Sequence, residues 1–287
     1  MKNYIGLFRV QQWVKNLFLF LPAFFARAFN TETGFHLVLA FLVFSVLASS
    51  VYILNDIIDA PADRLHPEKK HRPIAANKIG AHSAGIIGLI MAAVALTCAY
   101  FISLQFLFAC CIYLTLNLAY SFGLKKIALI DITIVSIGFL IRLFIGGVIS
   151  NVPISNWMYI MTFLLAMLLS IGKRRDDLLI LKNEDKQISE LMPGYSLAFV
   201  NVVSVMLSTI IIVAYIMYSI SKEVTTRVGS EYVYVTSLFV FLGILRYLQL
   251  AFIAETTGNP TNILLKDNPI KLAVLGWILT YGIFLYW

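Results

Sequence analysis

The sequence predicts an all-α, polytopic membrane protein, and three observations lead to that class. The chain has 287 residues, of which 60% are hydrophobic and only 13% are charged, and its mean hydropathy is +0.85. A soluble domain of this length needs far more polar surface. The apolar residues also fall into about nine runs, most of them near the ~20 residues that a helix needs to cross a bilayer.

The predicted membrane-spanning helices follow one another along the chain with short connections. The first is short, and the second ends at an acid-rich stretch. The third and fourth meet at Ser103-Leu104-Gln105, a weakly polar junction that could instead be a kink, which would leave eight spans. The sixth is again short and ends at Gly172, before a charged stretch. The predicted helices cover approximately 16–29, 35–55, 84–102, 104–121, 128–150, 157–172, 197–219, 232–253 and 271–287.

Lysine and arginine residues are concentrated in alternate connections. One side of the membrane receives the N-terminal segment and the strongly basic loops, whereas the other side has, for example, the uncharged 151–156 turn. Because cytoplasmic loops carry the excess of Lys and Arg, we expect the N-terminus in the cytoplasm and the C-terminus outside, which nine spans satisfy and eight do not. The expected location is the cytoplasmic (inner) membrane. A single domain, 1–287, is expected, with cytoplasmic loops at about 56–83, 122–127, 173–195 and 254–270.

The net charge of +7 could suggest a nucleic-acid partner, but the distribution of the basic residues does not. They lie in a few short segments between apolar runs, which favours membrane orientation and anionic substrates. The sequence has no G-x-S-x-G, P-loop or G-x-G-x-x-G motif, so acyl hydrolysis, ATPase and dinucleotide chemistry have no support.

Oxygen-bearing side chains gather where the second predicted span ends. Asn55, Asp59 and Asp63 are spaced i, i+4, i+8, which places them on one face of a helix. Such a set suits Mg²⁺, which binds through one or two carboxylates together with substrate phosphates. Carboxylates at a membrane boundary are costly to desolvate, which favours a functional site. The alternative is an ordinary acidic loop paired with its basic neighbours.

Two features adjoin this cluster. Pro61 should kink or end the helix nearby, so we expect Asp56 and Asp59 on its last turn and Asp63 on the turn beyond. A basic segment that includes Arg72 follows at once. Cations beside a metal-binding acidic cluster are typical of a site for a phosphate-rich substrate.

Three other segments carry charge in places that call for an explanation. Lys173-Arg174-Arg175-Asp176-Asp177 leaves the sixth span, and its cations suit phosphate, although a basic cluster that fixes topology is the alternative. Arg142 lies within a span, so it must face a partner or a polar cavity, either as a structural ion pair or as a phosphate ligand. Gln12-Trp13-Val14-Lys15-Asn16 precedes the first span and could be an interfacial anchor.

The stretch Asn55–Asp63 resembles the first aspartate-rich motif of the UbiA superfamily of intramembrane prenyltransferases. This resemblance implies nine helices around a cytoplasm-facing cavity that binds a Mg²⁺-diphosphate. Most members carry a second aspartate-rich motif after the sixth helix, where this chain has Lys173, Arg174 and Asp177. That departure is similar to one branch, the polyprenyl-phosphate (decaprenyl-phosphate) phosphoribosyltransferases.

The similarity to this branch covers nearly the whole chain. Two differences stand out: Asp177 occupies a place where the branch usually has Glu, and Pro61 lies inside the metal motif. The matching positions are Gln12-Trp13-Val14-Lys15-Asn16, Tyr120-Ser121, Lys125, Asp131, Arg142, Gly146, Tyr195 and the segment from Gly258-Asn259-Pro260 to Asp267.

The resemblance implies transfer of 5-phosphoribose from phosphoribosyl pyrophosphate to a polyprenyl phosphate, with Mg²⁺ as cofactor and release of pyrophosphate. Asn55, Asp59 and Asp63 are the expected metal ligands, and Asp56, Asp59 and Asp63 the expected catalytic residues. The expected substrate-binding residues are Lys15, Arg72, Tyr120, Lys125, Arg142, Lys173 and Arg174.

Three other functions stay open at this point. One is an aromatic prenyltransferase that uses a polyprenyl diphosphate, against which the missing second aspartate motif counts. Another is a transporter lined by intramembrane charges, although no internal inverted repeat is evident. The third is a catalytically inactive lipid-binding or assembly protein, which the intact carboxylate set disfavours. The oligomeric state also stays open, a homo-oligomer included.

Overall fold

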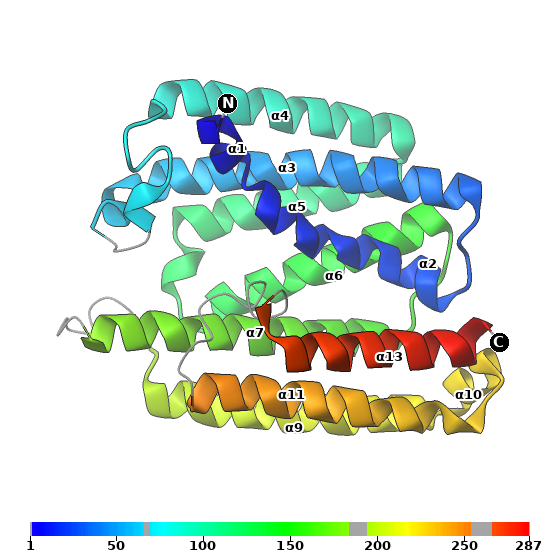
Figure 1. Cartoon of the computed structure of the whole chain (residues 1–287). Coiled ribbons are helices and arrows are strands. Elements are labelled where there is room, and N and C mark those ends of the chain that lie inside the picture. Colours follow the sequence, from blue (N-terminus) through cyan, green and yellow to red (C-terminus); the bar gives the residue numbers. More distant parts are fainter. Residues whose placement is uncertain (1, 66–68, 184–193, 254–265, 287) are drawn as a thin grey trace. The chain divides into compact units, whose positions relative to one another are not determined.

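The computed structural model describes residues 2–65, 69–183, 194–253 and 266–286, and within these ranges every regular element is helical (Figure 1). This confirms the all-α class. Contacts divide the chain into two compact units, Met1–Lys125 with Ile141–Ile154, and Lys126–Leu140 with Ser155–Trp287. Parts of three expected loops, including Gly258, Asn259 and Pro260, lie outside the described residues.

The first unit is built around one long helix, α3 (Thr31–Asp63), against which α4 and α5 pack (Figure 1). The N-terminal segment also packs along α3, and the second half of α6 completes the unit. The other elements are α1 (Lys2–Phe8), η1 (Val10–Phe20), α2 (Leu21–Phe25), η2 (Lys69–His71), α4 (Ala81–Ile102), α5 (Leu104–Phe122), η3 (Leu124–Lys126) and α6 (Ile130–Ser150).

Eight helices in the described part of the chain are long and apolar enough to cross a membrane. They correspond to the second through ninth predicted spans. The predicted first span, 16–29, is instead the 3₁₀ helix η1, which begins at Val10, followed by the short helix α2. Pro22 lies in the first turn of α2, where its missing N–H has no intrahelical partner to lose.

Helix α3 extends beyond its predicted end at residue 55 and includes the whole acid-rich stretch. The expectation that Asp63 lies beyond the helix is therefore wrong. Pro61 removes only its own backbone donor, and the Arg64 N–H still donates to the Ala60 carbonyl at 3.2 Å, so the helical bonding continues past the proline.

The junction between the third and fourth predicted spans is a true break. Ser103 has an extended backbone (φ −167°, ψ 138°) between α4 and α5. Its hydroxyl accepts a hydrogen bond from the Gln105 N–H at 3.2 Å, which satisfies one of the free donors at the start of α5. Two helices, rather than one kinked helix, therefore occupy 81–122.

The second unit is an antiparallel helical layer held by an apolar core between α7, α9 and α11, in which Leu168, Ile171, Val200 and Ile244 are buried. Its elements are the first half of α6, α7 (Asn156–Asn183), α9 (Leu197–Ser219), α10 (Lys222–Val228), η4 (Glu231–Thr236), α11 (Ser237–Phe252) and α13 (Asn268–Tyr286) (Figure 1).

Helix α7 continues to Asn183, so the prediction that Lys173–Asp177 forms a loop is wrong. No proline follows Gly172 within the helix, and the Lys, Arg and Leu residues there are strong helix formers. As a result, Lys173, Arg174, Arg175 and Asp177 project from a rigid helix rather than from a flexible connection.

Candidate active site

Asn55 and Asp59 lie one turn apart near the end of α3, as the i, i+4 spacing predicts. The Asn55 side-chain oxygen accepts a hydrogen bond from the Ser121 hydroxyl at the end of α5. Asp59 forms an ion pair with Lys125 of η3, and 35% of its side chain is exposed. The end of α5 and the following η3 therefore bring one hydroxyl and one ammonium group to this face of α3.

Asp56 and Asp63 are more deeply buried and share one arginine. Asp56 is 1% exposed and is paired with Arg9, and Arg72 Nη1 also lies 3.3 Å from its Oδ1. Asp63 is 4% exposed and accepts from Arg72 Nη1 at 2.6 Å. These ion pairs fasten the N-terminal segment and the segment that carries Arg72 to the end of α3.

A second cluster of polar side chains in the same unit is centred on Arg142 of α6, which is 4% exposed. Its Nε donates to the Asn16 side-chain oxygen at 2.7 Å, and the Asn16 amide donates to Ser45 Oγ at 2.8 Å. The guanidinium also lies over the rings of Phe44 and Tyr113, 5.0 and 5.2 Å from their centroids. Contacts of this kind accommodate a buried charge.

Lys15 is half-buried on η1, before the predicted first span and outside the eight candidate spans. Burial, together with the positive charges of Arg142 and Arg9, lowers the pKa of Lys15 to about 8. Nearby, Trp13 Nε1 donates to Ser49 Oγ at 3.0 Å. The segment predicted as an interfacial anchor is therefore joined by specific polar contacts to α3 and α6.

The second unit holds its own charged cluster at the start of α6 and on α7. Arg174 Nε and Nη2 both lie 2.7 Å from Asp131 Oδ2, and Arg174 Nη1 is 3.4 Å from Asp177. The Tyr195 hydroxyl donates to Asp131 Oδ1 at 2.6 Å and accepts from the Leu129 N–H at 2.9 Å. Burial and the bond to Asp131 raise the pKa of Tyr195, so its hydroxyl stays a hydrogen-bond donor.

The remaining predicted substrate-binding residues lie at the ends of helices. Tyr120 is half-buried on the last turn of α5, and Lys173 is exposed on α7. Within the first unit, the structure brings together Asp59 with Lys125, and Asp63 with Arg72. The roles of all these residues in catalysis and binding stay predictions.

The oxygen ligands near the end of α3 fit a magnesium ion through their chemistry. Asn55 and Asp59 offer an amide and a carboxylate oxygen one turn apart, and Asp59 is accessible. Among the described residues, no three His, Cys, Asp or Glu side chains converge as a complete metal cage. Mg²⁺ commonly binds through one or two carboxylates, substrate phosphates and water, so this set suits a metal that arrives with its substrate.

Sequence reasoning gave no individual site role to three residues that organise these clusters. Arg9 has a left-handed backbone (φ 49°) between α1 and η1, which directs its side chain to Asp56. Asn16 joins Arg142 to α3, and Tyr113 lines the same guanidinium. A signal for this contact surface was the pair Ser45 and Ser49, two small polar residues at i, i+4 within an apolar span.

Comparison with known proteins identifies the fold and the family. The sequence model of the UbiA prenyltransferase family matches residues 16–178, more than half of the chain. The chain belongs to this family. It is therefore a transferase and an integral, multi-pass membrane protein, as predicted.

Two curated relatives are named decaprenyl-phosphate phosphoribosyltransferase. The one from Mycolicibacterium smegmatis is 31% identical over 97% of this chain and 91% of its own length. The one from Corynebacterium glutamicum is 30% identical over 96% of this chain and 84% of its own length. The similarity between this chain and these relatives thus extends well beyond the family match.

The solved structure of a UbiA homologue from Archaeoglobus fulgidus bound to GPP and Mg²⁺ is similar to this chain with a TM-score of 0.71, at 18% sequence identity and 98% coverage of both chains. At this identity the similarity establishes the fold alone. It confirms the predicted UbiA-like helical architecture.

Proposed function

We propose that this family member transfers 5-phosphoribose from phosphoribosyl pyrophosphate to a polyprenyl phosphate and releases pyrophosphate. The observation that carries the proposal is the segment after Gly172, which presents Lys173 and Arg174 where most of the family has a second aspartate-rich motif. Two anionic substrates favour one acidic cluster together with many cations, whereas a prenyl diphosphate is conventionally held by two acidic clusters. The names of the curated relatives support the same reaction.

Asn55, Asp59 and Asp63 would hold Mg²⁺ on the pyrophosphate. When bound, the ion supplies charge neutralisation for the departing pyrophosphate. Both Asp59 and Asp63 have a cationic partner, Lys125 and Arg72 respectively. When a carboxylate binds the metal, its cationic partner would be released to bind substrate phosphate. The acidic and cationic groups would therefore work together.

The cations have the complementary task of positioning the two substrates. Lys15, Arg72, Lys125, Arg142, Lys173 and Arg174 would hold donor and acceptor phosphates, and Tyr120 would also contact substrate. The acceptor phosphate is already ionised at neutral pH, so it needs no strong general base. Positioning two anions for attack at the ribose C1 then provides most of the rate increase.

Asp131 and Tyr195 support this task in the second unit. Asp131 accepts a hydrogen bond from Arg174 through its Oδ2 atom. Its Oδ1 atom accepts one from the Tyr195 hydroxyl, which holds the carboxylate in place. The planar fork of Arg174 is thereby held in one orientation, and a fixed guanidinium plane suits recognition of phosphate.

A second candidate is prenyl transfer from a polyprenyl diphosphate to an aromatic acceptor, because the A. fulgidus neighbour is bound to GPP and Mg²⁺. Each donor supplied separately to the purified protein distinguishes the two reactions. Incorporation from phosphoribosyl pyrophosphate into polyprenyl phosphate supports the first proposal, and product formed only from the prenyl diphosphate replaces it with the second.

The metal assignment is tested by assaying Asp59→Asn and Asp63→Asn in detergent with radiolabelled phosphoribosyl pyrophosphate. Both variants are expected to lose at least about 100-fold in turnover, in line with the several kcal/mol that a metal supplies. Glu223→Gln, on the exposed face of α10, is the matched control and should keep wild-type turnover. Wild-type turnover in both aspartate variants would end the metal assignment.

We further propose that the protein lies in the cytoplasmic membrane with its N-terminus in the cytoplasm and its C-terminus outside. The uneven distribution of Lys and Arg supports this orientation. It requires an odd number of crossings, so the segment 16–29 would cross the membrane in addition to the eight candidate helices. Reporter fusions at the C-terminus test it: a reporter that is active only outside the cytoplasm should be active, and activity of a cytoplasm-specific reporter instead would reverse the orientation.

A further inference from the structure

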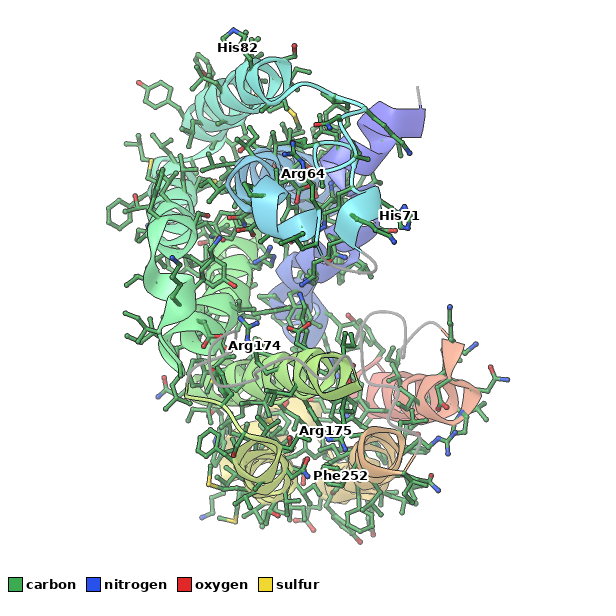
Figure 2. The ribbon with its side chains drawn as sticks, turned by 90° about the vertical axis from the view of Figure 1, so that its left-hand side faces the viewer. Arg64, His71, His82, Arg174, Arg175 and Phe252 are labelled. Atoms are coloured by element: carbon green, nitrogen blue, oxygen red, sulfur yellow. The ribbon has the colours of Figure 1, made fainter. Side chains whose placement is uncertain are left out.

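Helix α7 turns two adjacent arginines to opposite sides. Arg174 faces Asp131 of α6, whereas Arg175 donates from Nε to the Asn201 side-chain oxygen of α9 at 2.9 Å. Figure 2 shows the two side chains on opposite sides of the α7 ribbon, with Phe252 of α11 near Arg175. The two arginines therefore serve different purposes, and the phosphate-binding task proposed for Arg174 does not explain Arg175.

Arg175 is an unusual buried charge. It lies within a candidate membrane span and is 4% exposed. It donates to Asn201, lies over the ring of Phe252 with 5.3 Å between Cζ and the ring centroid, and interacts electrostatically with Tyr247. No described carboxylate lies within ion-pairing distance of it, and its buried Nη1 has no hydrogen-bond partner. A buried guanidinium with an unused donor is costly, so the site calls for an anion.

A groove of about 340 Å³ adjoins this arginine. It is lined by Asn201, Val202, Val205 and Phe252, so both contacts of Arg175 belong to its wall. Val202 and Val205 are 68% and 46% exposed on α9. On a membrane-spanning helix, exposed valines of this kind face lipid. The groove therefore offers an apolar surface, and the guanidinium of Arg175 lies behind Asn201, the polar residue of its lining.

The position of the groove near the ends of two helices also fits a lipid. Asn201 lies one turn into α9, which starts at Leu197, and Phe252 is the last residue of α11. Helices α9 and α11 are neighbours, so the start of one and the end of the other mark the same edge of the unit (Figure 1). The ends of membrane-spanning helices lie at the level of lipid headgroups.

We propose that the groove between α9 and α11 binds an anionic phospholipid, with its phosphate on Asn201 and Arg175 and an acyl chain along Val202 and Val205. Basic pockets between membrane-spanning helices recognise anionic headgroups in this way. Rotation of the Phe252 ring away from the guanidinium gives the phosphate access to Nη1. The occupant is a bilayer lipid rather than the proposed acceptor, because Arg175 points away from the Arg174 cluster to which we assign substrate phosphate.

The proposal is tested with the full-length protein in nanodiscs of phosphatidylcholine, with or without phosphatidylglycerol. Lipids retained after release are measured by native mass spectrometry, and the midpoint of thermal unfolding is measured in parallel. Phosphatidylglycerol should be retained preferentially and should raise the midpoint by about 3 °C or more. The readouts need no activity, so their outcome is independent of the proposed reaction.

Two variants remove the site by different routes. Val205→Trp fills the groove and leaves Arg175 in place, which keeps the test valid if Arg175→Gln fails to fold. Val213→Trp is the matched control, because Val213 is 54% exposed on the same helix and lies outside the groove. Preferential retention and the thermal shift should disappear in Val205→Trp and in folded Arg175→Gln and persist in Val213→Trp.

Three results would overturn the proposal. Equal retention of phosphatidylcholine by the wild type would show that the groove does not recognise charge. Unchanged phosphatidylglycerol retention in Val205→Trp would place the lipid elsewhere. Displacement of the retained phosphatidylglycerol by an equimolar short polyprenyl phosphate would assign the groove to that lipid instead.

Discussion

At the scale of single residues, the acid-rich stretch of α3 contains side chains in two kinds of environment. Asp56 is buried beneath Arg9 and Arg72, whereas Asp59 is accessible beside Lys125. A buried carboxylate with two arginine partners has the contacts of a structural anchor. An accessible carboxylate with one exchangeable partner is better suited to a metal. The sequence treats these aspartates alike, and their partners distinguish them.

Substitution of the two aspartates should therefore have different effects on stability. Asp56→Ala leaves two arginines without their buried partner and should lower the free energy of unfolding by about 3 kcal/mol. Asp59→Ala breaks a partly exposed pair and should lower it by less than about 1 kcal/mol. Chemical unfolding in detergent measures both values. Equal losses in the two variants would contradict the division between anchor and metal ligand.

Lys15 gives a prediction about pH. Because its pKa is lowered to about 8, its ammonium charge is present below pH 8 and is lost as the pH rises through that value. Binding of an anionic substrate should weaken over the same range, so kcat/KM, which reports the free enzyme, should fall above about pH 8. Lys15→Arg keeps its charge at these pH values and should move the fall to higher pH. An identical alkaline decline in Lys15→Arg would exclude Lys15 as its source.

At the scale of elements, the contact between η1 and α6 depends on a close approach of two backbones. A Cβ atom on Gly146 would clash with the Leu19 carbonyl oxygen. Glycine at this position therefore lets η1 lie directly on α6, and Arg142, one turn earlier on α6, bonds to Asn16 of η1. The contact aligns the segment that carries Lys15.

Gly146→Ala tests this contact. The added methyl group must push η1 away from α6, and we expect a loss of about 1–3 kcal/mol in the free energy of unfolding, as in other overpacked contacts. Gly282→Ala on α13 is the control, because nothing lies within 4 Å of its Cβ position. Thermal unfolding of both variants in detergent gives the comparison. Equal midpoints would show that the separation between η1 and α6 is not fixed by Gly146.

Much of the element order was predictable, because hydropathy marks long apolar helices clearly. The span 197–219 coincides with α9. The weakly polar junction at Ser103 allows either a break or a kink, and the structure has the break. Hydropathy misplaced the ends of α3 and α7, where polar residues continue the helix, since a charged stretch ends an apolar run without ending the backbone hydrogen bonding. The i, i+4, i+8 spacing of the metal motif depends only on helical geometry, so it could be predicted.

The partners of the charged residues could not be predicted in the same way. Arg142 bonds to Asn16, which is 126 positions away, and Asp131 pairs with Arg174, which is 43 positions away. Such pairs depend on which helices are neighbours, and a single sequence carries no direct signal of that. Arg9 is a further case, because its link to Asp56 requires a left-handed backbone that its residue type does not favour.

At the scale of the whole molecule, the chain distributes its chemistry between two compact units. One unit carries the proposed metal ligands of α3 with the cations Lys125 and Arg72, and the other carries Lys173 and the Asp131–Arg174–Tyr195 cluster. This composition, one acidic set and a larger cationic set, is the basis for choosing phosphoribosyl pyrophosphate over a prenyl diphosphate as donor.

The most direct test of that choice is mass spectrometry of the lipid after the purified protein is incubated with Mg²⁺, phosphoribosyl pyrophosphate and a short polyprenyl phosphate. We predict a lipid that has gained one phosphoribosyl group, formed together with pyrophosphate and absent when Asp59→Asn replaces the wild type. An unchanged polyprenyl phosphate, together with a prenylated aromatic product when a polyprenyl diphosphate and an aromatic acceptor are supplied, would contradict it.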